Sequence, residues 1–267
     1  MIEPRGRHAE ARVCECSEVC HTCHGARFIF EKDAARREVA EICECEVLRT
    51  RIRWYNEARI PGKFYDARLS EQFRDRGNQV VFNTFKLLAT DYSRGHKGVV
   101  LMGPSGVGKT FLVAAFLYEI IFAKGVPAAF RDFSQLLADL RSGYSQDRPE
   151  LEVIGPLVEV ELLVVDELGK GRNTPWELNV LDGIISQRYN NRKTTVFTSN
   201  YTESRSTTLA ERVRGKDVIP GEGDVETRDT LKDRVGARIH SRLREMCDFV
   251  TLLGPDRRDL EPEANQA

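Results

Sequence analysis

The sequence contains no apolar run long enough to cross a lipid bilayer. Its longest apolar helix candidate, at 111–123, is interrupted by Glu119 and is shorter than the roughly 20 residues that a membrane span needs. The first residues are charged and lack the apolar segment of a signal peptide, so we expect a cytoplasmic protein without membrane contact. Net charge is also nearly absent, because 40 Lys and Arg stand against 41 Asp and Glu. The charge total by itself therefore does not require a nucleic-acid partner.

Cysteine is concentrated at one end of the chain. Six of the seven cysteines lie between Cys14 and Cys45, in a stretch with few long apolar runs. A small module of this kind needs a staple to fold, and in a reducing compartment a cysteine cluster is a candidate metal site. The composition and the Pro61-Gly62 turn signal predict four parts: a cysteine-rich module at 1–50, a linker at 51–70, a core at 71–255 and a C-terminal tail at 256–267.

Beyond the predicted linker, apolar runs alternate with helical patterns. The predicted strands are 99–102, 128–130, 162–165 and 194–198, and the predicted helices are 110–123, a segment capped by Asp132, 178–189 and 236–246. This alternation predicts an α/β fold, in which helices cover both faces of a parallel sheet. Ligands of such folds bind beyond the carboxyl ends of the strands.

A phosphate-binding motif follows the first predicted strand of the core. The sequence matches G-x-x-x-x-G-K-[ST] in full, between a strand and a helix, and this context disfavours a simple glycine-rich turn. Backbone N–H groups of such a loop bind phosphate oxygens at a helix N-terminus. We expect Lys109 to add charge for the β and γ phosphates and Thr110 to bind Mg²⁺. The predicted nucleotide-binding residues are Gly103, Pro104, Ser105, Gly106, Val107, Gly108, Lys109 and Thr110.

Polar residues also end two later strands of the core. Asp166 and Glu167 follow the apolar run 162–165. In P-loop NTPases an aspartate at this position binds Mg²⁺ through water, and a neighbouring carboxylate polarises the attacking water. Asn200 ends the next strand and either orients that water or only forms an Asx turn.

Two pairs of arginines are further candidates. Arg238 and Arg242 share one face of the helix predicted at 236–246, where they form either surface ion pairs or an arginine finger for a neighbouring subunit's nucleotide. Arg257 and Arg258 follow a strand-like run near the C-terminus. They are either ligands of the γ-phosphate or part of a basic tail.

The cysteine cluster predicts a structural zinc site. Two cysteine pairs supply four thiolates, which close a tetrahedral Zn²⁺ shell and leave no position for a catalytic water. A surplus pair, Cys14 and Cys16, is able to replace the second pair, and His21 and His24 lie nearby, so the ligand set stays open. The first-choice ligands are Cys20, Cys23, Cys43 and Cys45.

Together these motifs resemble the bacterial DnaC/DnaI-type helicase loaders, the branch of AAA+ ATPases that also contains the IstB transposition ATPases. The resemblance implies a RecA-like AAA+ αβα sandwich with a small N-terminal zinc-binding domain, and an extra strand between the phosphate-loop and acidic strands. It also implies Asn200 as sensor 1, Arg242 as the trans-acting finger and Arg258 as the late γ-phosphate sensor. The resemblance is carried by Cys20–Gly25, Cys43–Cys45, Ile60–Pro61, Gly103–Thr110, Leu163–Gly169, Arg188–Tyr189, Thr198–Asn200 and Ser241–Leu243.

The family resemblance further implies a function. It predicts an ATP hydrolase, with ATP, Mg²⁺ and Zn²⁺ as cofactors, that loads the hexameric replicative DNA helicase during DNA replication. Loaders of this kind bind the helicase through the N-terminal domain and single-stranded DNA through the ATPase domain, and we expect self-assembly when ATP is bound. One alternative is an IstB-like regulator of a transposase, which the zinc module disfavours. Another is a nucleotide-binding adaptor with little turnover.

Overall fold

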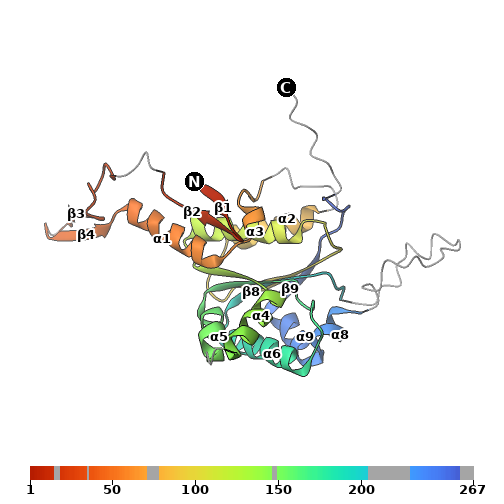
Figure 1. Cartoon of the computed structure of the whole chain (residues 1–267). Coiled ribbons are helices and arrows are strands. Elements are labelled where there is room, and N and C mark those ends of the chain that lie inside the picture. Colours follow the sequence, from red (N-terminus) through yellow and green to blue (C-terminus); the bar gives the residue numbers. More distant parts are fainter. Residues whose placement is uncertain (15–18, 35, 71–77, 146–148, 204–228, 259–267) are drawn as a thin grey trace.

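The computed structural model describes residues 1–14, 19–34, 36–70, 78–145, 149–203 and 229–258 (Figure 1). Its centre is a parallel sheet, as the alternation of strands and helices predicts. The strands run in the order β6 (Ala128–Asp132), β7 (Leu162–Asp166), β8 (Thr194–Ser199), β5 (Gly98–Met102) and β9 (Cys247–Thr251). Strand β8 lies between the phosphate-loop strand β5 and the acidic strand β7. The expected extra strand is therefore confirmed.

Helices cover both faces of the sheet, and this prediction is also confirmed (Figure 1). Side chains alternate along each strand, so that Val99 and Leu101 enter one apolar core while Val100 and Met102 enter the other. The first core includes residues of α1 (Glu44–Ala58), α2 (Gln79–Thr90) and α3 (Lys109–Glu119). The second includes residues of α4 (Phe133–Tyr144), α5 (Glu150–Glu159), α6 (Pro175–Asn190), α8 (Leu231–Val235) and α9 (Ala237–Met246).

Local capping sets the ends of the helices beside the sheet. Helix α3 continues into a π-helical turn, η4 (Ile120–Lys124), and Gly125 ends it with a φ of 67°, a left-handed conformation that glycine adopts without steric cost. The Asp132 carboxylate accepts the backbone N–H of Gln135 at 2.8 Å and caps α4 as predicted. The Gln135 side chain binds Asp139 instead of returning to the cap.

The first strands of the chain pack on the body that contains the parallel sheet. Hairpin β1 (Ile2–Arg5) and β2 (His8–Ala11) buries Ala9 and Ala11 in the first core. The Asn56 side chain of α1 pairs with the backbone of Ala11 through bonds of 2.7 and 3.0 Å. Residues 51–58, which the sequence places in a linker, form the second half of α1, and Tyr55 is buried there. These residues of the predicted linker are thus helical, and the apolar face of α1 packs on the core.

A second hairpin, β3 (Phe28–Lys32) and β4 (Glu38–Ile42), stands out from the body as an arm beyond the start of α1 (Figure 1). Along the chain, the arm is followed by α1 and then by the short 3-10 turn η2 (Gly62–Phe64), both of which pack on the body. The division into four parts stays a prediction, and its tail lies outside the described residues from 259 onward. None of the helices in the described part of the chain has the length and apolar content that a membrane span needs.

Candidate functional site

The phosphate loop turns tightly between β5 and α3. Gly108 has a φ of 101°, which side chains rarely adopt, and a Cβ on Gly103 would lie 2.2 Å from the Leu252 carbonyl oxygen. Lys109 is buried and donates from Nζ to the carbonyl oxygens of Gly103 and Pro104, at 2.7 and 2.6 Å. Burial lowers the pKa of Lys109 to about 8. At the position where the motif binds phosphate, the loop thus holds the Lys109 ammonium group. Its two hydrogen-bond partners named here are carbonyl oxygens and not carboxylates.

A cavity of about 560 Å³ opens over this loop. It brings together nine residues that the sequence predicts for the site: the loop residues 105–110, Glu167, Asn200 and Arg258. Lys63 and Phe64 of η2 line the same cavity, together with Asn78, Phe82, Arg257 and Leu252. Sequence reasoning missed all of these additional residues except Arg257, because only tertiary packing brings η2 and the start of α2 over the phosphate loop.

Asp166 ends β7 beside the first turn of α3. Its carboxylate is 5% exposed and accepts a hydrogen bond from the Thr110 hydroxyl at 3.1 Å. The Thr198 hydroxyl also donates to it. Burial raises the pKa of Asp166 to about 6. A hydroxyl and a carboxylate oxygen are the hard ligands that Mg²⁺ prefers, so Thr110 and Asp166 fit the metal that the sequence predicts.

Glu167 has an unusual backbone for a residue with a side chain. Its φ is 59°, and non-glycine residues in this region concentrate at functional sites. The backbone N–H of Glu167 donates to the Thr198 hydroxyl at 3.0 Å. Its side chain reaches Lys170, whose Nζ lies 2.7 Å from Oε2. The backbone conformation therefore fixes the direction in which the Glu167 side chain leaves the main chain, and Lys170 holds the carboxylate at the end of that side chain.

Thr198 is the site residue whose role sequence reasoning missed. It lies at the end of β8 next to β7 and contacts both acidic residues, through its hydroxyl to Asp166 and from the N–H of Glu167. The sequence signal that could have identified Thr198 is its position two residues before Asn200, at the end of a strand adjacent to the acidic strand. Asn200 itself follows β8 and lines the cavity.

The arginines near the C-terminus contact the phosphate loop. Arg258 donates from Nη2 to the Ser105 hydroxyl at 3.1 Å and pairs with Asp256 at 2.6 Å. The backbone N–H of Arg257 donates to the Gly106 carbonyl at 2.9 Å. Of the two sequence alternatives, contact with the nucleotide site is thus the one that this geometry favours.

Arg242 lies elsewhere, on α9. Its Nη1 is 2.6 Å from Oδ1 of Asp182 on α6, and Arg238 reaches the other oxygen of Asp182 at 3.2 Å. Within one chain these arginines therefore form the surface ion pairs that the sequence also allowed. Arg242 is not among the residues that line the cavity of its own chain, so a role as a finger stays a prediction about a neighbouring subunit.

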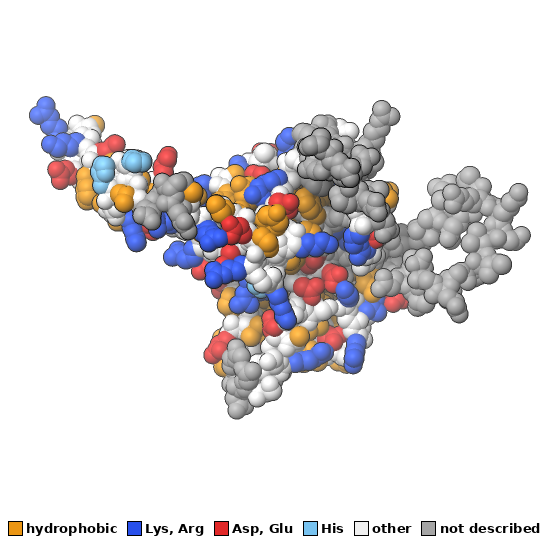
Figure 2. Space-filling view, turned by 45° about the horizontal axis from the view of Figure 1, so that its top comes forward, with side chains coloured by type: hydrophobic (Ala, Val, Ile, Leu, Met, Phe, Trp, Pro, Cys, Tyr) orange, Lys and Arg blue, Asp and Glu red, His pale blue; other side chains and the backbone are white. Residues whose placement is uncertain are grey.

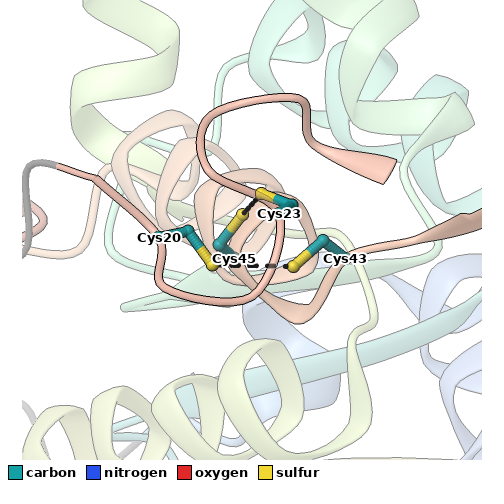
Figure 3. A group of neighbouring side chains, drawn as sticks. All are labelled: Cys20, Cys23, Cys43 and Cys45. Atoms are coloured by element: carbon teal, nitrogen blue, oxygen red, sulfur yellow. Dashed lines mark hydrogen bonds between the residues drawn. The ribbon is translucent and has the colours of Figure 1, made fainter. Parts of the chain in front are cut away.

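Four cysteines meet where the arm joins α1 (Figure 3). The sulfurs of Cys20, Cys23, Cys43 and Cys45 all lie within 4.8 Å of one another. The Cys20–Cys43 and Cys23–Cys45 sulfur distances are 3.7 and 3.5 Å, close to the roughly 3.8 Å between sulfurs bound tetrahedrally to zinc at about 2.3 Å. The donor set and its spacing therefore fit a structural zinc ion.

The four thiols of this cluster affect one another's protonation. Backbone N–H groups of Cys23 and Thr22 lower the pKa of Cys20 to about 6. The neighbouring Cys23 thiol and burial raise the pKa of Cys45 to about 12. Four sulfurs at this distance do not all ionise without a positive charge among them. Cys14 is exposed, disulfide-bonded and outside the group, and Cys16 lies outside the described residues.

Comparison with known proteins agrees with this site. The family model of the IstB-like ATP binding proteins matches residues 71–210. The replicative helicase loader DnaC of Escherichia coli is 24% identical over 43% of this chain and 47% of its own length. Rv3427c of Mycobacterium tuberculosis, named as an ATP-binding protein in an insertion sequence, is 30% identical over 39% of this chain and 41% of its own.

Solved structures extend the likeness to the fold. The crystal structure of the DnaC helicase loader aligns with a TM-score of 0.58 at 25% identity, over 72% of this chain and 99% of that one. The DnaI structure aligns with a TM-score of 0.55 at 25% identity, over 73% of this chain and 93% of that one. The chain spans about half the length of the curated relatives it matches, including 44% of YqaM from Bacillus subtilis. With its phosphate loop, acidic strand and α/β P-loop fold, this chain belongs to the IstB-like ATP-binding protein family.

Proposed function

We propose that the chain is a cytoplasmic ATP hydrolase that loads a hexameric replicative DNA helicase onto single-stranded DNA. The observation that carries the proposal is the presence of two sites in one chain, the nucleotide cavity and the four-cysteine cluster, at opposite ends of α1. The likeness to the DnaC and DnaI structures supports it. IstB-like ATPases are not expected to have a cysteine-rich N-terminus.

The residues of the cavity divide the work of hydrolysis. Phosphate oxygens of ATP replace the carbonyl partners of Lys109 and bind the backbone N–H groups of the loop. Thr110 and Asp166 hold Mg²⁺, which neutralises charge on the β and γ phosphates when bound. Glu167 accepts the proton of the attacking water, and Asn200 orients that water. Glu167 lines the cavity, and its backbone N–H donates to the Thr198 hydroxyl.

Two arginines complete the site from different chains. Arg258 reaches the phosphate loop of its own chain through Ser105 and senses the γ-phosphate there. Arg242 acts on the nucleotide of a neighbouring subunit, so ATP binding and self-assembly depend on each other. Its ion pair with Asp182 involves side chains that are 24 and 23% exposed, and it keeps the guanidinium extended on α9.

The arm is proposed to be the surface that binds the helicase. Its hairpin exposes apolar side chains, and hydrophobic atoms are visible on it in the space-filling view (Figure 2). Exposed apolar groups gathered in one place are typical of interaction sites. The zinc ion holds the base of this arm, since its ligands come from both sides of the hairpin. The exposed apolar residues of the hairpin are Phe28, Phe30, Val39 and Ile42, and Val47 and Leu48 continue them on the first turns of α1.

A pull-down from the protein's own cell extract tests the proposal. The intact chain is used as bait with ATP and Mg²⁺, and Lys109→Ala is the matched control. Recovery of a hexameric helicase with the wild type, and less of it with the variant, supports a loader. Recovery of a transposase instead contradicts it.

The second candidate function is an ATPase that regulates a transposase. The family model over residues 71–210 and the likeness to Rv3427c favour it. The same pull-down separates the two candidates, because their partners differ. A third possibility is an adaptor with little turnover. Glu167→Gln tests it, because this substitution leaves the ATP turnover of such an adaptor unchanged but lowers the turnover of a hydrolase.

A further inference from the structure

The end of α1 meets both the hairpin β1–β2, which lies beside it in Figure 1, and strand β6. The backbone N–H of Gly62 donates to the carbonyl oxygen of Arg7, in the turn of the hairpin, at 2.9 Å. Arg59 is the residue that follows α1. From β6, Nη1 of Arg131 donates to the carbonyl oxygen of Ala58 at 3.3 Å. Three arginines from distant parts of the sequence therefore come together, and none of them lines the nucleotide cavity.

These three arginines lack acidic partners. On the same hairpin, Arg5 pairs with Glu10 at 3.2 Å. In the described part of the chain, by contrast, none of Arg7, Arg59 and Arg131 forms an ion pair. Only Nη1 of Arg131 has hydrogen-bond partners among the described residues, and both are carbonyl oxygens. Positive charge therefore collects at this place, although the whole chain has a net charge of −1.

The protonation of two residues shows that the charges of this cluster act on one another. Burial and then the charge of Arg59 lower the pKa of Arg131 to about 10, while Asp139 opposes the shift. Burial also lowers the pKa of His8, and the charges of Arg59, Arg131 and Arg7 act in the same direction. The Nδ1 atom of His8 is buried and has no hydrogen-bond partner in the described residues. An anion among these groups would offset their mutual repulsion.

Arg59 has a backbone that does not suit its side chain. Its φ is 60°, and the residue that follows a helix in this left-handed conformation is usually glycine. The side chain is exposed, so burial gives no reason for an arginine here. Residues in such backbone conformations concentrate at functional sites. A role for the guanidinium group toward a ligand would account for arginine at this position.

We propose that Arg7, Arg59 and Arg131 bind a phosphodiester group of single-stranded DNA. This inference rests on the proposed function, because it names a surface by which the loader holds the strand. A guanidinium group donates two parallel hydrogen bonds to phosphate oxygens, which an ammonium group does not. Arg7 and Arg59 are exposed and Arg131 is partly buried. The exposed pair suits a polymer that passes over the surface, and Arg131 gives the site a fixed floor.

The test measures fluorescence anisotropy of a labelled oligodeoxythymidylate with the full-length chain and a non-hydrolysable ATP analogue, at several salt concentrations. Arg59→Gly is the main variant, because glycine removes the charge and suits the φ of 60°. Its Kd is expected to rise about two- to five-fold, as for loss of an exposed ion pair. The slope of log K against log salt should become about 0.7 less steep, as for loss of one phosphate contact to a single strand. Arg7→Ala, added to this variant, should reduce the slope again by about the same amount.

Three controls make the result specific. Arg59→Lys keeps the charge and is expected to keep the wild-type slope. Arg5→Ala changes the net charge by the same amount on the same hairpin, but its side chain is 80% exposed and paired with Glu10, so Kd and slope should not change. Inorganic phosphate at equal ionic strength is expected to compete with the DNA no better than chloride, because a single small anion does not gain the further contacts of a strand.

The inference is overturned if Arg59→Gly keeps the wild-type Kd and slope, or if Arg5→Ala reduces the slope equally. It is also overturned if inorganic phosphate displaces the DNA and Arg59→Gly abolishes this competition, since the site then holds a small anion. An oligoglutamate peptide that binds as tightly as the DNA, and loses binding in Arg59→Gly, would overturn it as well.

Failure of the proposed function is seen separately. A wild-type chain that binds DNA with the expected dependence on Arg59, but hydrolyses no ATP or recovers no helicase, overturns the proposed function alone. A wild-type chain that binds no single-stranded DNA overturns both.

Discussion

Asp166 is buried in the protein interior, which disfavours the charged form of its carboxylate. The effect of this burial on stability gives a test of the site in the absence of ligand. Burial raises its pKa from 3.8 to about 6, while hydrogen bonds from Thr198 and Thr110 oppose the shift. The folded chain therefore binds a proton at Asp166 more tightly than the unfolded chain does. As pH rises from about 4 to about 6, this residue lowers the free energy of unfolding by about 3 kcal/mol.

Asp166→Asn removes the ionisable group but keeps an oxygen that accepts from both hydroxyls. We expect the variant without metal and nucleotide to be more stable than the wild type at pH 7, by up to about 3 kcal/mol. The difference in stability between variant and wild type should shrink as pH falls through about 6 toward 4, because the wild-type carboxylate becomes neutral there. The gain in stability comes with a loss of function, since the amide of the variant is a poor substitute for a carboxylate ligand of Mg²⁺.

The assay is urea denaturation in EDTA at several pH values, followed by the same series with Mg²⁺ and ATP. Asp248→Asn serves as a matched control, because its side chain is exposed. Its stability difference from the wild type should not change with pH. The reasoning is refuted if Asp166→Asn is less stable than the wild type at pH 7 without ligand, or if its advantage is independent of pH.

Three further predictions concern binding, assembly and the metal. Glu167→Gln should bind ATP with wild-type heat in calorimetry, while its turnover falls about 100-fold or more, as expected for loss of a general base; unchanged turnover would remove this role. Arg242→Ala should lower the assembly-dependent rate about 1,000-fold, whereas Arg238→Ala should not; equal rates for Arg242→Ala and wild type under assembly conditions would exclude the trans finger. Metal analysis of the full chain should find one equivalent of zinc, and chelation should abolish partner binding while ATP binding to the core persists; a chain purified without zinc would contradict the site.

The central part of the fold was predictable because its signals are local. The continuous apolar runs at 99–102 and 162–165 became the buried strands β5 and β7. The phosphate motif depends on a fixed spacing, and its loop lies where a strand meets a helix. The pairing of Cys20 and Cys23 with Cys43 and Cys45, one of the alternatives that the sequence left open, is the grouping seen in the described residues.

The N-terminal region was less predictable, because its contacts are distant in sequence. The short strand His8–Ala11 has no apolar run, and its small alanines are buried by packing on α1 and η2. The bond between Asn56 and Ala11 joins residues 45 positions apart. Arg188 illustrates the same limit within a helix. A charged residue is normally exposed, yet this one is buried and donates to carbonyl oxygens of α5 and the turn after it.

Helix α1 connects the cysteine cluster to the segment that reaches the nucleotide cavity. Cys43 and Cys45 lie at its first turn, and beyond its last turn Phe64 meets Phe111 edge to face above the nucleotide cavity. Fifteen helical residues make a rod about 22 Å long. A tilt of about 10° at the nucleotide end would displace the metal end by about 4 Å. A small change of angle at the end of α1 nearer the nucleotide cavity would therefore be a larger displacement at the base of the arm.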